Sequence, residues 1–311
     1  MQLTTLAPDR YLPGSDLLAA INTALFLRRP LLLSGDPGTG KTECAHFVAR
    51  QLGHSFPDKF NAAKALRFDT KSVSQSTDLF YSYDAVAHFG DRTNQPKESF
   101  IAFNSMGIAL LATHPPAADM HRFANYQKVL DQQPATGSVI LIDEIDKAPR
   151  DFPNDLLAEL EKPPFRFSIK ELPGFTVQQN DELPIVVIIT SNNEKGLPDA
   201  FLRRCVFHHI NFPDSAELMR IVNANLALGD INIQPAINLF MEIRSANIAK
   251  QPATSELIDW IACLHQKQLL NDGLANWSTA DADYRRRLAS TLGIIAKNKA
   301  DAETLKRKIE G

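Results

Sequence analysis

The stretch that decides the fold lies near the start of the chain and reads Gly35-Asp36-Pro37-Gly38-Thr39-Gly40-Lys41-Thr42. It fits the pattern G-x-x-x-x-G-K-[ST], which is typical of loops that bind phosphate. The apolar run Leu31-Leu32-Leu33 precedes it, and an apolar-periodic helix is expected over residues 42–52. Glycines let such a backbone turn its N–H groups towards phosphate oxygens, and the following helix adds the positive end of its dipole. The sequence therefore predicts a nucleotide-binding loop between a buried strand and a helix.

Two side chains at the end of this loop have separate expected tasks. Lys41 would reach the β- and γ-phosphates of the nucleotide, and the Thr42 hydroxyl would bind Mg²⁺. The remaining nucleotide-binding residues, expected to cradle the phosphates, are Gly35, Asp36, Pro37, Gly38, Thr39 and Gly40.

Length and composition narrow the class of protein. The chain has 311 residues, of which 44% are hydrophobic, enough for one large or two moderate domains. The formal net charge of −3 argues against a broad nucleic-acid surface, although a local basic channel stays open. The three cysteines lie far apart in sequence, which fits a reducing cytosol. No signal peptide or membrane-length apolar run is visible, so a soluble, cytoplasmic protein is expected.

The order of the predicted elements indicates an α/β core followed by a helical domain. After residues 31–34, further core strands are expected over residues 66–70, 139–142, 185–190 and 205–211. Helices are expected over about 214–229, 232–247, 254–270 and 281–298, with a charged segment at the end. Strands separated by helices form parallel sheets. We therefore expect a nucleotide-binding core over residues 1–213 and a helical lid domain over residues 214–311.

Two segments of the core do not fit simple strand–helix alternation. Residues 71–137 contain no clear core strand, so they are expected to form an inserted element. Within it Phe123, Tyr126, Val129 and Leu130 would form a helical stripe. Residues 165–179 alternate apolar and polar side chains around Pro173-Gly174, which predicts a β-hairpin.

An acidic pair, Asp143-Glu144, ends the apolar strand 139–142. Ligands gather at the carboxyl ends of parallel strands, where Asp143 would hold the hydrated Mg²⁺ that Thr42 also contacts. The adjacent Glu144 would polarise the water that attacks the γ-phosphate. A GTPase or a small-molecule kinase has no need of this second acid.

Polar residues between the fourth and fifth predicted strands complete the candidate catalytic set. Asn192 would steer the attacking water, although Ser-Asn-Asn is also good turn chemistry. Arg203 and Arg204 would reach a neighbouring subunit's γ-phosphate more easily than their own. An arginine supplied in trans accelerates hydrolysis by orders of magnitude. The alternative for both arginines is a basic surface turn.

These motifs, taken in order, resemble those of the AAA+ ATPases. The matching stretches are Gly35–Thr42, Ile142-Asp143-Glu144-Ile145-Asp146-Lys147-Ala148-Pro149, Thr190-Ser191-Asn192 and Leu197-Pro198-Asp199-Ala200-Phe201-Leu202-Arg203-Arg204. Within these ATPases the chain resembles the MoxR-like group, a helix-2-insert clade. That group carries an acidic pair followed by an apolar residue, a polar residue, a basic residue and Ala-Pro. It also carries a helical insert after the second strand and a β-hairpin before the fourth.

The resemblance implies a five-stranded sheet in the order 5-1-4-3-2, a hexameric ring, and ATP with Mg²⁺ bound between neighbours. It implies remodelling of a protein client beside a partner with a von Willebrand factor A domain. By position, Asn192 is the first sensor and Arg204 the finger, because the family pattern has an acidic residue where Arg203 stands. Arg203 would assist Arg204 or take its place. The family's lid arginine has no match in residues 250–257, where Lys250 is the candidate substitute.

Two rival functions belong to other classes. A nucleotide-gated signalling or assembly switch would hold ATP and cycle rarely, and turnover with and without partners separates it from a remodelling ATPase. A restriction-type nucleic-acid motor would show ATP hydrolysis stimulated by DNA, with a steep fall at raised salt. The acidic balance of the chain disfavours the motor.

Overall fold

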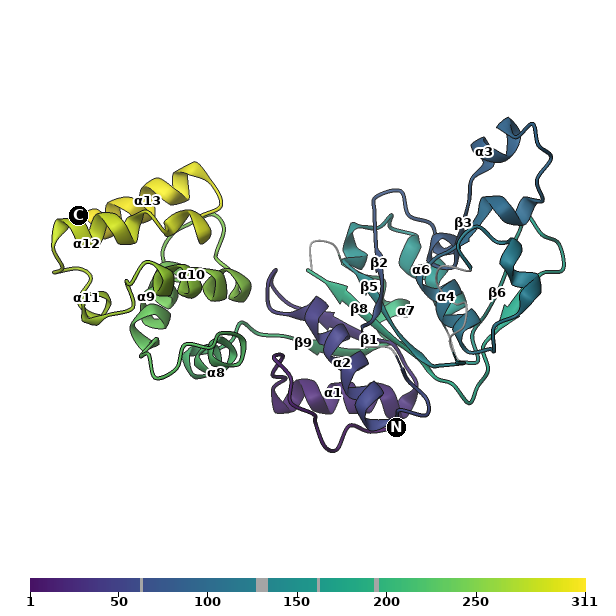
Figure 1. Ribbon diagram of the computed structural model, residues 1–311, viewed down its shortest axis with the longest axis horizontal. Coiled ribbons are helices and arrows are strands. Elements are labelled where there is room, and N and C mark those ends of the chain that lie inside the picture. The colour runs from purple at the N-terminus through teal and green to yellow at the C-terminus, as the bar shows by residue number, and fades with distance from the viewer. Residues whose placement is uncertain (62–63, 127–133, 161–162, 193–195) are drawn as a thin grey trace. The chain divides into compact units, whose positions relative to one another are not determined.

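A computed structural model describes residues 1–61, 64–126, 134–160, 163–192 and 196–311 (Figure 1). The chain divides into two compact units. The first unit comprises Met1–Pro8, Pro13–Gly35 and Lys41–Ile210, and the second comprises Asp9–Leu12, Asp36–Gly40 and Asn211–Gly311. None of the helices in the described part of the chain has both the length and the apolar character needed to cross a bilayer.

The first unit is built on a five-stranded parallel sheet. Its strands are β1 (Leu31–Ser34), β2 (Leu66–Asp69), β5 (Ser138–Asp143), β8 (Ile185–Ser191) and β9 (Val206–His209). They lie in the order β2-β5-β8-β1-β9. If these five strands are numbered 1 to 5 along the chain, their order from the β9 edge is 5-1-4-3-2. The predicted fold class is therefore confirmed. The central strands β1 and β5 are buried throughout, as expected for a sheet covered on both faces.

The register of the sheet brings polar strand ends to one edge. Ser34 pairs with Ser191, and Asp69 pairs with Asp143. Helices α1 (Ser15–Leu27) and α2 (Lys41–Ser55) pack on the sheet, α1 on β1 and β9 and α2 on β5 and β8. Because parallel strands all end at the same edge, the sequence-predicted site residues on β5 and β8 become neighbours.

The insert between β2 and β5 contains two strands as well as helices. Its elements are η1 (Ser76–Leu79), β3 (Tyr81–Tyr83), α3 (Ala85–Gly90), η2 (Lys97–Phe100), β4 (Ile101–Phe103), α4 (Ser105–Ala112) and η3 (Ala118–Arg122). Strands β3 and β4 pair antiparallel, with α3 at the far end of the insert (Figure 1). Of the stripe predicted over residues 123–130, Phe123 and Tyr126 are buried, whereas Val129 and Leu130 lie outside the described residues.

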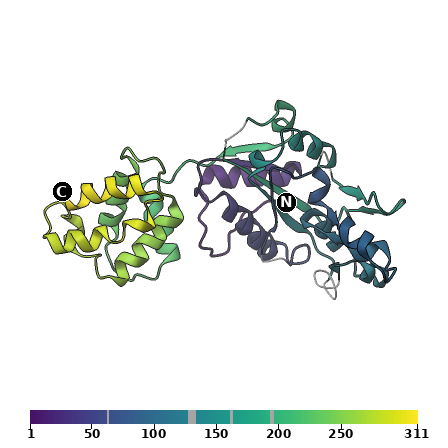
Figure 2. The same cartoon turned by 90° about the horizontal axis from the view of Figure 1, so that it is seen from above.

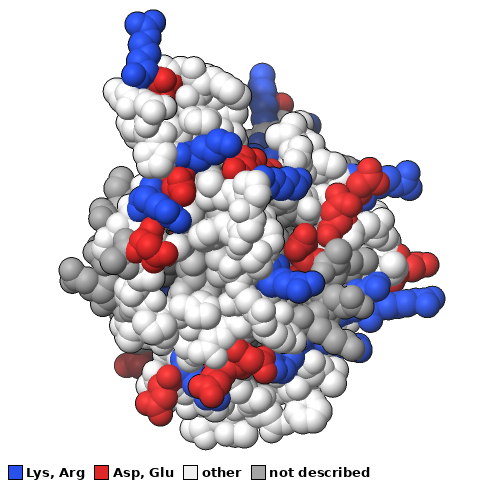
Figure 3. All heavy atoms as spheres, turned by 90° about the vertical axis from the view of Figure 1, so that its right-hand side faces the viewer, with Lys and Arg blue, Asp and Glu red and all other residues white. Residues whose placement is uncertain are grey.

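A β-hairpin packs against this insert. Helix α6 (Phe152–Glu159) leads to strands β6 (Arg166–Ser168) and β7 (Thr176–Gln178), which pair antiparallel. The Phe167 ring lies 5.2 Å from the Phe80 ring and 6.3 Å from the Phe103 ring, so hairpin and insert share one apolar core. Figure 3, which views this side of the molecule, shows basic and acidic side chains interspersed rather than gathered by sign.

The second unit is mainly helical (Figure 2). Its apolar side chains form a core of their own. Its helices are α8 (Ser215–Asn225), α9 (Gln234–Arg244), α10 (Thr254–Gln266), α11 (Asp272–Ala275), α12 (Ala282–Ala289), η5 (Leu292–Ile294) and α13 (Lys299–Glu310). The helix expected over residues 281–298 is interrupted, since α12 ends at Ala289 and η5 follows it. Between them the Thr291 hydroxyl donates to the Leu288 carbonyl and accepts from the buried Trp260 indole. The last charged segment forms α13, which buries Leu305 and Ile309.

Candidate functional site

The loop predicted to bind phosphate adopts the backbone that its glycines permit. Gly38 and Gly40 have φ of 77° and 87°, a region that side chains other than glycine rarely adopt. The Thr39 hydroxyl donates to the Asp36 carbonyl at 2.9 Å, which closes the turn. Lys41 begins α2, and its buried ammonium donates to the Gly35 carbonyl at 2.7 Å. The amino group predicted to meet phosphate is therefore held at the loop that would surround it.

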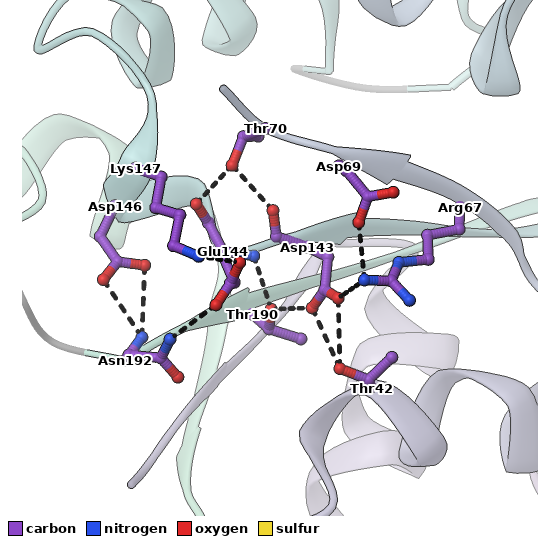
Figure 4. Close-up of polar contacts among 10 residues, drawn as sticks. All are labelled: Thr42, Arg67, Asp69, Thr70, Asp143, Glu144, Asp146, Lys147, Thr190 and Asn192. Carbon is purple, nitrogen blue, oxygen red and sulfur yellow. Dashed lines mark hydrogen bonds and ion pairs between the residues drawn. The ribbon is translucent and has the colours of Figure 1, made fainter. Parts of the chain in front are cut away.

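Asp143, the last residue of β5, has a carboxylate that accepts from three neighbouring side chains (Figure 4). The Thr42 hydroxyl lies 3.2 Å from Oδ1 and 3.3 Å from Oδ2, and the Thr190 hydroxyl donates to Oδ1 at 2.6 Å. Arg67 Nη2 lies 2.9 Å from Oδ2. Hydroxyl and carboxylate oxygens are the ligand class that Mg²⁺ prefers. The side chains of Thr42 and Asp143 therefore fit the predicted metal.

Glu144 leaves the strand in a left-handed conformation, with φ 55° and ψ 53°. Such a backbone costs a non-glycine residue about 1–2 kcal/mol, so surrounding contacts must hold it. Its N–H donates to the Thr190 hydroxyl at 2.8 Å, and its carbonyl lies beside the Thr70 hydroxyl. The turn sends the two acidic side chains in different directions. Asp143 faces Thr42, whereas Glu144 faces Asn192 (Figure 4).

Two donors meet the Glu144 carboxylate. Asn192 Nδ2 donates to Oε1 at 3.1 Å, and Lys147 Nζ donates to Oε2. Lys147 reaches back because it ends the single 3₁₀ turn η4 (Ile145–Lys147), where residues three apart share one side. Asn192 is itself fixed, since its N–H donates to the carboxylate of buried Asp146, 3.2 Å from Oδ1. The structure thus brings together Asn192 and Glu144, which the sequence placed on separate strands.

Five supporting residues were not predicted from the sequence as parts of the site: Arg67, Thr70, Asp146, Lys147 and Thr190. Arg67 and Asp69 lie two residues apart on β2 and form an ion pair of 2.6 Å, and Arg67 also contacts Asp143. Charged residues alternating towards the end of a core strand were the available signal. Thr190 lies within the quoted motif Thr190-Ser191-Asn192, but its contact with Asp143 depends on the pairing of β5 with β8.

Arg203 and Arg204 lie apart from the acidic pair. They follow the short helix α7 (Asp199–Leu202), and both are exposed. Arg204 Nη1 donates to the Ala200 carbonyl at 3.1 Å. Within the described part of the chain, neither arginine bonds to Asp143 or Glu144. The next residue, Cys205, is half-buried, and this burial raises the pKa of its thiol to about 12. A thiol that stays protonated is a poor nucleophile, so Cys205 is a packing residue.

In the second unit, an arginine contacts residues 251 and 252, within the stretch where the family's lid arginine has no match. Arg244, the last residue of α9, donates to the side chain of Gln251 at 3.1 Å and to the Pro252 carbonyl. Its guanidinium also lies 3.4 Å from the centre of the Phe212 ring. Lys250 is exposed, and its backbone N–H donates to Asp301. Arg244, six residues before Lys250 in the sequence, thus occupies the region where Lys250 was the candidate.

Thr190 offers a test of how the acidic pair is fixed. Replacing Thr190 with valine keeps the side-chain volume but leaves the Glu144 N–H without its acceptor. An unpaired buried donor costs about 1–3 kcal/mol. We expect Thr190→Val to lower the free energy of unfolding by that amount in urea titrations. Thr190→Ser keeps the hydroxyl and should resemble the wild type; equal behaviour of the valine and serine variants would contradict this role.

Comparison with known proteins adds a family assignment. The model of the ATPase family associated with various cellular activities (AAA) matches residues 31–214. This range contains Gly35–Thr42, the acidic pair, Asn192 and both arginines. No curated protein sequence matches the chain.

Two solved structures show a distant similarity. The crystal structure of domain III from the Thermotoga maritima replication initiation protein DnaA is 15% identical, covers 95% of this chain and 100% of that one, and has a TM-score of 0.46. The closed-state cryo-EM reconstruction of Hsp104 with ATPγS and FITC casein is 17% identical. That match covers 81% of this chain and 45% of the other, with a TM-score of 0.41.

Proposed function

The chain belongs to the AAA family of ATPases, and from this premise we propose that it binds ATP with Mg²⁺ at the loop Gly35–Thr42 and hydrolyses it. The observation that carries the proposal is the convergence on one sheet edge. Thr42 contacts Asp143, and Asn192 contacts Glu144. Such an edge is where parallel α/β sheets bind ligands.

Each residue has a distinct task in the proposed reaction. The Lys41 ammonium neutralises phosphate charge, and Thr42 and Asp143 hold the Mg²⁺. When bound, the metal supplies positive charge to the β- and γ-phosphate oxygens. Glu144 accepts the proton of the attacking water, and Asn192 orients the Glu144 carboxylate through their 3.1 Å contact. The products are ADP and inorganic phosphate.

We further propose that the chain works as a MoxR-like hexameric ring that remodels a protein client, with a von Willebrand factor A protein as partner. Two features support this assignment. The insert β3–α4 lies between β2 and β5, and the hairpin β6–β7 precedes β8, as in the pattern that the sequence resembles. In this arrangement Arg204, or Arg203, enters the ATP site of the adjoining subunit.

Complementation between two inactive variants tests the ring. We expect Arg204→Ala to lower ATP turnover by about 10³-fold, because an arginine finger supplies transition-state stabilisation of that order. Lys41→Ala should also be inactive. Mixed, the two variants should regain activity, since an intact loop of one subunit can meet an intact Arg204 of the next.

Arg203→Ala, mixed in the same way, identifies which arginine acts. Wild-type chains that elute as monomers with ATP, or Arg204→Ala and Arg203→Ala chains that both turn over normally, would contradict the trans arrangement.

One observation favours a second candidate, the nucleotide-gated switch. Both oxygens of the proposed base accept a hydrogen bond, one from Asn192 and one from Lys147. A base engaged in this way accepts a proton slowly, which would suit a protein that holds ATP until a partner arrives. ATP turnover measured alone and with a partner separates slow gating from continuous cycling.

A further inference from the structure

A hollow of about 450 Å³ lies beside the proposed base in the first unit. The turn Ile145–Pro149 forms one wall, and Pro153 of α6 and Gly196–Pro198 contribute others. Most of these residues are apolar, and Ile145 and Ala148 are buried side chains of the main core. The hollow therefore has the size and the walls to take a few side chains of a protein segment.

The charges that line this hollow are unequal in their exposure. Asp146 is 2% exposed, and its carboxylate faces inwards to the Asn192 N–H. Lys147 and Arg150 are both exposed. Among the residues that the structure describes, Arg150 forms no ion pair. The accessible charge of the hollow is therefore positive, which favours an acidic occupant.

Lys147 links the hollow to the proposed base. Lys147 is one of the residues that line the hollow, and its ammonium pairs with Glu144 Oε2, in an ion pair whose two side chains are 46% and 37% exposed. Exposed ion pairs of this kind are weak and readily exchanged. A carboxylate entering the hollow would compete for Lys147 and leave Glu144 with Asn192 as its remaining partner.

We propose that this hollow binds an acidic segment of a partner protein, whose carboxylate draws Lys147 away from Glu144 and thereby raises ATP hydrolysis. The apolar walls favour a peptide over a free anion, because inorganic phosphate would leave them without contacts. This inference rests on the proposed function, since it assigns regulation to the same site. It makes Lys147 a positioning residue that restrains Glu144, and Arg150 a residue that recognises the partner.

The first arm of the test compares wild-type and Lys147→Met chains. Methionine keeps the length and apolar contacts of the lysine stem but removes the charge. Basal ATP turnover should rise by up to about fivefold, the ratio that an exposed ion pair can maintain. Thermal unfolding checks that the variant is folded. A folded Lys147→Met chain that hydrolyses ATP more slowly than the wild type would overturn the inference, because Lys147 would then assist Glu144.

The second arm uses a short synthetic peptide of glutamate, leucine and proline, labelled with fluorescein, and a matched peptide with glutamine for glutamate. The glutamate peptide should bind the wild type by fluorescence anisotropy and stimulate its ATP turnover, and the glutamine peptide should do neither. Arg150→Gln should keep wild-type basal turnover and lose peptide binding. In Lys147→Met the glutamate peptide should no longer stimulate turnover.

Other results would overturn the assignment. Inorganic phosphate or sulfate that stimulates as well as the peptide would make the occupant a free anion. ATP turnover per chain is also measured at increasing protein concentration. If it rises for the wild type but not for Arg150→Gln, the occupant of the hollow is a second copy of this chain. If the wild type hydrolyses ATP but neither binds the glutamate peptide nor is stimulated by it, the hollow is not a docking site for an acidic segment. A wild type and a Lys147→Met chain that both fail to hydrolyse ATP would instead contradict the proposed function.

Discussion

Lys41→Ala is expected to lose ATP binding almost completely. The ammonium of Lys41 is buried at the start of α2 and held 2.7 Å from the Gly35 carbonyl, where the loop closes around it. A hydrogen bond to a charged group contributes about 1.5–3 kcal/mol, and Lys41 is proposed to contact more than one phosphate oxygen. We therefore expect affinity to fall at least about 100-fold. Titration of a fluorescent ATP analogue at fixed Mg²⁺ measures the change.

A matched control tests whether the effect is specific to the lysine at the loop or follows from removing any positive charge. Lys299 has a side chain that is 90% exposed, so Lys299→Ala should bind ATP like the wild type. Thermal unfolding without nucleotide tests whether Lys41→Ala is folded, because that variant also loses the bond to Gly35. A folded Lys41→Ala chain with wild-type affinity would contradict the assignment of the phosphate-binding loop.

Glu144→Gln is expected to bind ATP but to hydrolyse it at least about 100-fold more slowly, since a positioned general base contributes about 10²–10⁴-fold. Glutamine has the same shape, and its amide oxygen can still accept from Asn192 as Glu144 Oε1 does at 3.1 Å. What it loses is the ability to take a proton from water. Release of inorganic phosphate measures turnover, and the fluorescent titration measures affinity.

The control for this substitution is Glu182→Gln, an exposed residue of the same unit that should change neither quantity. If Glu144→Gln released phosphate at the wild-type rate, Glu144 would not be the base. Weakened ATP binding with an unchanged rate would instead place Glu144 among the binding residues. The proposed role is supported only if Glu144→Gln keeps its affinity for ATP and loses its rate of phosphate release.

Local patterns predicted most of the fold because each depends on near neighbours in sequence. The apolar runs at residues 31–34, 139–142 and 185–190 lie within β1, β5 and β8. The loop glycines were expected to let the backbone turn its N–H groups towards phosphate, and Gly38 and Gly40 have the positive φ that such a turn uses. The end of α12 at Ala289 was not predicted, because a helix was expected to continue to residue 298. Thr291, two residues beyond that end, bonds to Trp260, which lies 31 residues away in the sequence.

The candidate site also has a part that the sequence predicted and a part that it did not. The identities and spacing of Lys41, Thr42, Asp143, Glu144 and Asn192 predicted which residues would meet, since the carboxyl ends of parallel strands share one edge. How Glu144 is oriented was not predictable from the sequence. Its left-handed backbone is held by Thr70, which follows β2, and by Thr190 of β8.

The phosphate loop, the parallel sheet and the chemical types gathered at its edge follow from the sequence, because glycine conformations and apolar runs depend on local interactions and helices between successive strands make those strands parallel. Tertiary structure alone decided that Arg67 pairs with Asp143 and that Glu144 faces Asn192. Arg67 and Asp143 lie on paired strands, as do Glu144 and Asn192 at the ends of β5 and β8, and only the register of those strands sets the distance between the side chains.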